Sequence, residues 1–122
     1  MKIENEKLRM NSMSEKIKSL MSVTSYKLGS YKIDVENRLL MRKGTQVKLT
    51  QKEAYLLIYL AAHPNVLLKR KDILNDIWKD DSYSKARSMD VYICKIKKLI
   101  SEDPKLIIIN ISGVGYRLII RA

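Results

Sequence analysis

A chain of 122 residues with 46% hydrophobic content can form one compact domain, but it is too short for two domains of ordinary size. No apolar run approaches the ~20 residues of a membrane-spanning helix, and no apolar stretch follows the charged first residues, so neither a membrane span nor a signal peptide is expected. The 24 Lys and Arg residues outnumber the 13 Asp and Glu residues, and the net charge of +11 favours a polyanionic partner such as nucleic acid or an acidic membrane surface.

The N-terminal residues 1–24 are predicted to be a linker or flexible segment, and the domain is expected to occupy residues 25–122. The segment is polar with mixed charges, although four apolar residues recur near the spacing of one helix face, at Met10, Met13, Ile17 and Leu20. A helix this short is marginal on its own, so a linker is the favoured interpretation and a partner contact through the apolar stripe is the alternative.

Short strands are predicted over residues 26–49. Apolar Tyr31, Ile33 and Val35 alternate with polar neighbours, which is typical of a half-buried strand. Two further apolar segments flank a hairpin turn at residues 43–44. This pattern predicts a small antiparallel sheet.

Two helices are predicted next. Thr50 and Glu53 match a capping box at the start of the first helix, which Pro64 ends. Its expected buried stripe is Ala54, Leu57, Ile58 and Ala61. A second, short helix is predicted from about residue 70 to 78.

A third helix, over residues 85–101, is predicted after a polar loop at residues 79–84. Its core-facing residues lie within about 60° of arc: Met89, Ile93, Ile96 and Ile100. The opposite face is basic with small apolar groups between: Arg87, Val91, Cys94, Lys95 and Lys98. Lys97 adds charge at the margin, and Asp90 is the only acidic residue from 85 to 98. Such a face suits the major groove, where cations neutralise phosphates and small side chains allow close approach to base edges.

The chain ends in a predicted β-hairpin over residues 106–120, with a Gly-rich turn at 112–115. Arg117 lies on one face of its last strand and Tyr116 on the other, and a hairpin of this kind can lie beside the minor groove. No strand–helix–strand crossover is predicted, so the order of strands, three helices and a hairpin indicates an α+β fold. A solvated basic helix face is common in proteins, but its position between a helix–loop–helix and a hairpin favours DNA binding.

Together these segments resemble the effector domain of OmpR/PhoB-type response regulators over about residues 26–120, and most closely those of Bacteroides-type bacteria. The resemblance rests on five segments: Leu49-Thr50-Gln51-Lys52-Glu53, Ala62-His63-Pro64, Ile73-Leu74 with Ile77-Trp78, Arg87-Ser88-Met89-Asp90-Val91-Tyr92-Ile93 and Gly113-Val114-Gly115-Tyr116-Arg117. It implies a winged helix-turn-helix fold with an N-terminal antiparallel four-stranded sheet, three helices and a C-terminal β-hairpin wing.

The resemblance also implies function and partners. The domain would bind specific double-stranded DNA and regulate transcription, as a free monomer that forms head-to-tail dimers on direct repeats. A receiver domain and a sensor kinase would belong to a longer chain of a two-component phosphorelay. The residues expected at DNA are Arg87, Val91, Cys94, Lys95, Lys97, Lys98, Asn110, Ser112 and Arg117. Those expected at RNA polymerase are Lys79, Asp80, Asp81, Ser82, Tyr83 and Ser84.

Three departures from the family pattern stand out. The family usually carries Arg where Cys94 and often where Ser112 lie, and Lys69 replaces a common Ser or Thr cap before the second helix. Asn110 and Ser112 can still form hydrogen bonds to phosphates or the minor groove.

Other functions fit the residues less well. His63 is the sole histidine and Cys94 the sole cysteine, and neither belongs to a nucleophile or metal-binding motif, so no enzyme, metal or cofactor is expected. The single cysteine excludes an internal disulfide, and a reducing cytoplasm is the expected location. The remaining alternatives are a standalone or membrane-tethered winged-helix regulator without a receiver, and a winged-helix protein-interaction module. Duplex RNA is disfavoured because its narrow major groove does not admit a helix, and no membrane partner is expected.

Overall fold

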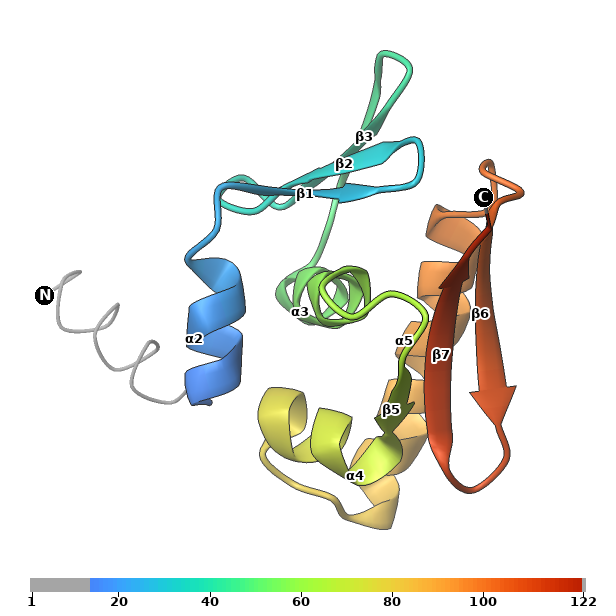
Figure 1. Ribbon diagram of the computed structural model, residues 1–122. Helices are drawn as coiled ribbons and strands as arrows, with labels where there is room; N and C mark the ends of the chain where they lie inside the picture. Colours follow the sequence, from blue (N-terminus) through green and yellow to red (C-terminus); the bar gives the residue numbers. More distant parts are fainter. Residues whose placement is uncertain (1–13, 122) are drawn as a thin grey trace, which may run out of the picture.

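The computed structural model describes residues 14–121. The structure contains two antiparallel sheets, one above the helices and one beside them in the view of Figure 1. The N-terminal sheet has the order β1-β2-β3-β4, and the C-terminal sheet has the order β5-β7-β6. The α+β architecture and the four N-terminal strands agree with the sequence prediction, whereas β5 was not predicted.

The N-terminal sheet consists of four short strands, β1 (Ser25–Leu28), β2 (Tyr31–Asp34), β3 (Leu39–Arg42) and β4 (Thr45–Lys48). Tyr31 and Ile33 of β2 are buried while Lys32 is exposed, as their alternation predicted. The predicted hairpin turn at residues 43–44 joins β3 to β4, and both of its residues have positive φ.

Helix α3 (Gln51–Ala61) forms the centre of the molecule. Thr50 and Glu53 form the predicted capping box, in which each side chain accepts a hydrogen bond from the other residue's backbone N–H. The prediction of a single buried stripe is too narrow, because every residue from 54 to 61 is buried. The reason is that α3 is surrounded, with α2, β1, β7, α5 and η1 all in contact with it.

The predicted N-terminal linker is replaced over part of its length by a helix, α2 (Glu15–Met21), which packs on α3. Ile17 is only 1% exposed, and Leu20 and Met21 also pack against the core. The hydroxyl of Tyr26 donates a hydrogen bond to the carbonyl of Leu20 at 2.7 Å. Tertiary packing thus stabilises a helix too short to be stable alone. Met10 and Met13, which were part of the same predicted stripe, lie outside the described residues.

The second predicted helix forms as α4 (Arg70–Ile73) followed by a π-helical turn, η1 (Leu74–Trp78). Lys69 stands at its N-cap and makes no capping hydrogen bond through its side chain. The third predicted helix is α5 (Tyr83–Leu99), which begins two residues earlier and ends two residues earlier than predicted. Ser82 is its N-cap, so the predicted loop is limited to residues 79–82, and Tyr83 and Ser84 belong to the helix.

The wing consists of β6 (Leu106–Ile111) and β7 (Gly115–Ile120), and β5 (Leu67–Lys69) extends it to three strands. Gly115 was predicted in the turn, but it is the first residue of β7. A Cβ atom on Gly115 would lie 1.9 Å from the carbonyl oxygen of Leu68, so this glycine allows β5 and β7 to pair.

Candidate DNA-binding interface

The exposed face of α5 has the composition predicted from its periodicity. Met89, Ile93, Ile96 and, just past the helix end, Ile100 are buried. The residues predicted on the opposite face are all exposed: Arg87, Val91, Cys94, Lys95 and Lys98. Lys97, predicted at the margin of this face, is exposed as well. Val91, at the centre of this face, is 56% exposed. The helix therefore presents a small apolar centre with cations around it.

Two aromatic rings lie under cations of this face. The guanidinium of Arg87 lies 5.8 Å from the ring centroid of Tyr83, and the ammonium of Lys95 lies 5.1 Å from that of Tyr92. Tyr83 is 78% exposed, so it adds a large aromatic surface at the first turn of α5. Cation–π contacts of this kind contribute about 0.5–1 kcal/mol at exposed sites. They also limit the positions that the two cations adopt.

The single carboxylate of this stretch of α5, Asp90, is paired within the protein. Arg70 of α4 donates to it through Nη1 at 2.8 Å and Nη2 at 3.2 Å, and the hydroxyl of Tyr116 of β7 donates to its Oδ1. Arg70 also donates to the Tyr116 hydroxyl at 3.1 Å. These three residues, the Arg70–Asp90–Tyr116 network, join α4, α5 and the wing. No single segment of the sequence indicated this network.

The hydrogen bonds of this network change the pKa values of Asp90 and Tyr116. Partial burial raises the pKa of Asp90, but hydrogen bonds from Arg70 and Tyr116 outweigh this effect, and the pKa lies below its usual value. Burial and the hydrogen bond to Asp90 raise the pKa of Tyr116 to about 12. At neutral pH Asp90 is therefore ionised and paired with Arg70, and its charge is largely compensated before any phosphate approaches.

The wing residues predicted at DNA differ in their positions. Asn110 and Ser112 are exposed near the turn that joins β6 and β7, where Val114 is also exposed. Arg117 is exposed too, but it lies in mid-strand opposite Ile109. Its Nε and Nη2 donate to the carbonyl oxygen of Asn65 at 3.2 and 3.0 Å. The structure therefore brings Asn110 and Ser112 to the wing tip and Arg117 to the turn before β5.

Two further cations lie between the wing tip and the start of α4. Lys69 and Lys71 line a surface hollow together with Gly113 and Val114 of the wing turn and Ala86 of α5. The backbone N–H of Arg70 donates to the carbonyl of Val114 at 3.0 Å, which holds the wing turn against α4. Sequence reasoning did not select Lys69 or Lys71 as DNA contacts, although the run Lys69-Arg70-Lys71 was a usable signal.

The short loop before α5 is exposed and acidic. Asp80 and Asp81 are both exposed, and Asp80 accepts a hydrogen bond from the backbone N–H of Ser82 at 2.9 Å. Of the six residues predicted at RNA polymerase, Lys79, Asp80, Asp81 and Ser82 precede α5, whereas Tyr83 and Ser84 form its first turn. All six form one exposed segment.

The described part of the chain, residues 14–121, contains no group of three or more His, Cys, Asp or Glu side chains that could hold a metal ion. It also contains no helix with the length and apolar character needed to cross a bilayer. The Nδ1 atom of His63 lies 2.8 Å from the carbonyl oxygen of Tyr59, and Cys94 is free and exposed.

Comparisons with known proteins agree with this geometry. Residues 44–118 match the family described as "Transcriptional regulatory protein, C terminal". The chain is 48% identical over 94 residues to the transcriptional regulatory protein RprY of Bacteroides fragilis, a match that covers 77% of this chain and 40% of RprY. The chain thus spans less than half of this relative.

Two solved structures are also similar. The DNA-binding domain of CssR from Bacillus subtilis has 29% identity and a TM-score of 0.63, with 73% of this chain and 99% of that chain covered. The DNA-binding domain of RstA from Klebsiella pneumoniae, in complex with the RstA box, has 26% identity and a TM-score of 0.66, with 80% and 98% covered. From the family match, this chain belongs to the C-terminal domains of transcriptional regulatory proteins, the OmpR/PhoB-type winged-helix DNA-binding domains.

Proposed function

We propose that the chain is the output domain of a two-component response regulator, which binds specific double-stranded DNA and regulates transcription. In this proposal α5 enters the major groove and the tip of the β6–β7 wing contacts the adjacent minor groove. The observation that carries the proposal is the exposed face of α5, which is basic, has a small apolar centre, and has its one carboxylate paired with Arg70.

Each group on this surface has a role suited to its chemistry. Arg87 holds a phosphate, and Lys95, Lys97 and Lys98 either neutralise phosphates or donate to guanine O6 and N7. Val91 and Cys94 are small enough to allow α5 to approach base edges, and Val91 can contact a thymine methyl. Further phosphates are contacted by side chains beside or on the wing: Lys69, Lys71, Asn110 and Ser112. Arg117 contributes if DNA displaces its contact with Asn65.

Partners beyond DNA are part of the same proposal. The chain is a monomer when free and forms a head-to-tail pair on direct repeats. The exposed segment at residues 79–84 contacts RNA polymerase. In a longer chain, a receiver domain phosphorylated by a sensor kinase controls the domain. The proposal places the protein in the cytoplasm and assigns it no catalytic step and no cofactor.

Selection from random duplexes, followed by fluorescence anisotropy at several salt concentrations, tests this proposal. A repeated half-site with a spacing of about 10–11 bp is expected. The double variant Lys95→Gln/Lys98→Gln should bind the selected duplex at least about tenfold more weakly. Its plot of log affinity against log salt should lose about two units of slope if both lysines contact phosphates.

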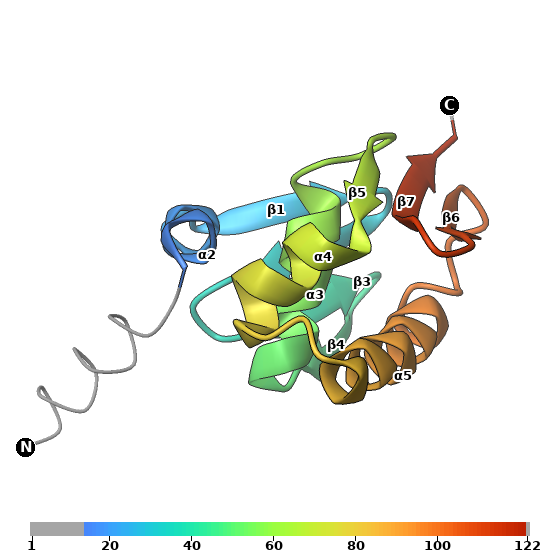
Figure 2. The same cartoon turned by 90° about the horizontal axis from the view of Figure 1, so that it is seen from below.

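A charge-matched control removes two lysines from α2, which lies across the molecule from the wing (Figure 2). The variant Lys16→Gln/Lys18→Gln has the same net charge as the α5 variant, and its affinity should stay within about twofold of wild type. Equal losses in the two variants would mean that net charge, and not the face of α5, makes the contact. Recovery of no preferred sequence would contradict sequence-specific binding.

A further inference from the structure

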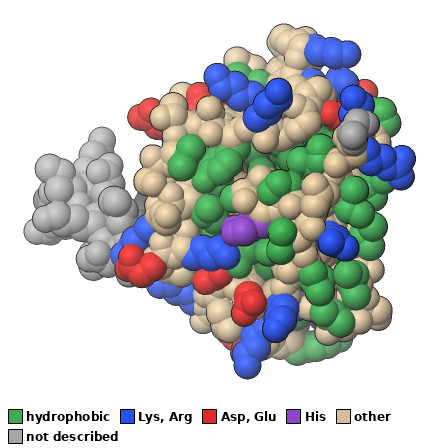
Figure 3. All heavy atoms as spheres, viewed as in Figure 1, with side chains coloured by type: hydrophobic (Ala, Val, Ile, Leu, Met, Phe, Trp, Pro, Cys, Tyr) green, Lys and Arg blue, Asp and Glu red, His purple; other side chains and the backbone are tan. Residues whose placement is uncertain are grey.

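A second concentration of positive charge lies between the N-terminal sheet and the base of the wing. It surrounds an open hollow of about 620 Å³. Five cations from segments far apart in the sequence line this basic hollow: Lys27, Arg42, Lys43, Lys105 and Arg121. In the space-filling view, Lys and Arg side chains gather near the C-terminus and along the upper edge (Figure 3).

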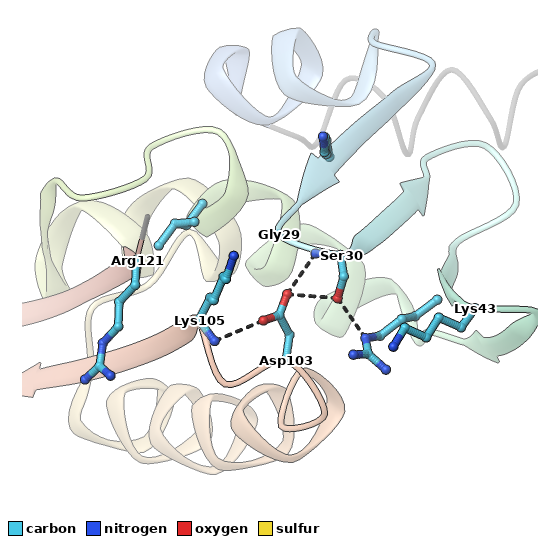
Figure 4. Close-up of a pocket in the computed structure, with 9 residues that line it drawn as sticks. Gly29, Ser30, Lys43, Asp103, Lys105 and Arg121 are labelled. Carbon is cyan, nitrogen blue, oxygen red and sulfur yellow. Dashed lines mark hydrogen bonds between the residues drawn. The ribbon is translucent and has the colours of Figure 1, made fainter.

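The floor of the basic hollow is held by hydrogen bonds around Asp103, which is 5% exposed. Its Oδ2 accepts from the backbone N–H and the hydroxyl of Ser30, both at 2.8 Å, and its Oδ1 accepts from the backbone N–H of Lys105 at 2.9 Å. Arg42 donates from Nε to the Ser30 hydroxyl at 2.7 Å (Figure 4). These bonds connect the β1–β2 turn to the segment between α5 and β6, and they hold the backbone of Lys105 and the guanidinium of Arg42 in place.

Four of the five cations of the basic hollow have no partner among the described residues. In residues 14–121, the side chains of Lys27, Lys43, Lys105 and Arg121 form no hydrogen bond or ion pair, whereas Arg42 donates to Ser30 and attracts the Asp103 carboxylate. Asp103 is the one carboxylate in the lining, so five cations and one anion leave a surplus of four positive charges. Glu102 lines a neighbouring hollow that Arg42 and Lys43 also line, and it pairs with neither of them.

The basic hollow lies at the opposite end of the wing from the wing tip. The wing turn contacts the start of α4, beside the first turns of α5. Asp103 and Lys105 come after the last turn of α5, beside the base of the wing (Figure 1). Because α5 has 17 residues, its first and last residues are about 25 Å apart. The proposed DNA contacts on α5 end at Lys98, and the residues that line the basic hollow come from the N-terminal sheet and from the segments beside the base of the wing, so the two surfaces share no residue.

We propose that the basic hollow docks an acidic segment of a protein partner. A small-molecule ligand is disfavoured because such sites bury most of the ligand surface, whereas this hollow is open. Lys43 and Lys105 extend on either side of Asp103, and Arg121 lies along the far rim (Figure 4). Several carboxylates spaced along an exposed segment match this arrangement, and complementary charge of this kind speeds association and sets orientation.

The probe for this proposal is a fluorescein-labelled peptide of six glutamates, added to the full 122-residue chain. NMR of the ¹⁵N-labelled chain should show the largest amide shift changes at Ser30, Lys43 and Lys105. In fluorescence anisotropy, the variant Lys43→Gln/Lys105→Gln should bind the peptide about fivefold more weakly. It should keep its affinity for the selected duplex within about twofold of wild type.

The matched control is Lys95→Gln/Lys98→Gln, which removes the same charge from α5 and should keep peptide affinity within about twofold. Equal losses of peptide binding in both variants would overturn the proposal, because net charge alone would explain them. Duplex binding that falls equally in both variants would also overturn it, because the basic hollow would then be part of the DNA surface. A chain that binds the peptide at the basic hollow but binds no duplex would refute the proposed DNA function and support this one.

Discussion

The Arg70–Asp90–Tyr116 network gives a prediction that net charge alone does not. Asp90 lies on the helix proposed to enter DNA, in a chain with a net charge of +11, so removing its negative charge looks harmless from the sequence. In the structure, the Asp90 carboxylate accepts hydrogen bonds from Arg70 and Tyr116 and connects three elements. The substitution Asp90→Asn should therefore destabilise the fold.

The magnitude follows from the number and exposure of these bonds. Hydrogen bonds to charged groups contribute about 1.5–3 kcal/mol each when well formed. The side chain of Asp90 is 49% exposed, so solvent screening reduces this contribution, and the asparagine keeps one oxygen acceptor. We expect Asp90→Asn to lower the free energy of unfolding by about 1–2 kcal/mol.

Urea unfolding of the free chain measures this loss. Asp81→Asn, in the exposed loop, removes the same charge and should change stability by less than about 0.5 kcal/mol. A double-mutant cycle between Asp90→Asn and Tyr116→Phe should give a coupling free energy of about 0.5–1.5 kcal/mol. If Asp90→Asn is as stable as wild type, or if the coupling is zero, the network does not stabilise the junction of α4, α5 and the wing.

Three further predictions concern the same fold. First, the pKa of Asp90 in the folded protein lies below 3.8. Its contribution to the free energy of unfolding is therefore present above pH 3.8, and it is lost as the pH falls through the lower pKa of the folded state. Tyr116, with a pKa of about 12, contributes below pH 10.0 and loses this contribution between pH 10.0 and about 12. Urea midpoints against pH should therefore lose part of their acid-side slope in Asp90→Asn, because Asp34 and Asp103 also have lowered pKa values, and part of their alkaline slope in Tyr116→Phe. Unchanged profiles would contradict the assignment. Second, Gly115→Ala should cost about 3 kcal/mol because its Cβ would lie 1.9 Å from the β5 carbonyl, whereas Gly113→Ala meets open space and should cost about 1 kcal/mol for its φ of 72°. Equal urea midpoints for the two glycine variants would show that the steric argument fails. Third, Ile17→Ala should lower the free energy of unfolding by about 2–4 kcal/mol, because Ile17 is 1% exposed, and no change would mean that α2 is not part of the folded unit.

The parts of the fold that sequence reasoning predicted correctly depend on local geometry. The spacing of Met89 and Ile93 places them on one face of α5 and Val91 on the other, whatever the rest of the chain does. The capping box of Thr50 and Glu53 satisfies backbone donors within four residues of each other. The composition of the exposed face of α5 could therefore be predicted from periodicity alone.

The missed features depend on contacts between distant segments. Asp90 meets Arg70 and Tyr116 only after α4, α5 and β7 have packed together, and no local pattern relates three residues so far apart. Helix α2 forms because α3 and η1 offer it a surface, so its stability is absent from its own propensity. Gly115 looks like a turn residue until β5 is placed beside it. In each case the feature depends on a residue or surface that another helix or strand supplies.

The positions of the positive charges also depend on how distant segments pack together. A value of +11 indicates an anionic partner, but it does not say how many surfaces share the charge. In the fold, one group of cations lies on the exposed face of α5 and another lines the basic hollow, beyond the C-terminal end of that helix. A B-DNA duplex carries one negative charge per about 1.7 Å of its axis, so a duplex on α5 neutralises the cations of that face, Lys95 and Lys98 included. The two groups of cations share no residue, so variants of one are the natural controls for the other.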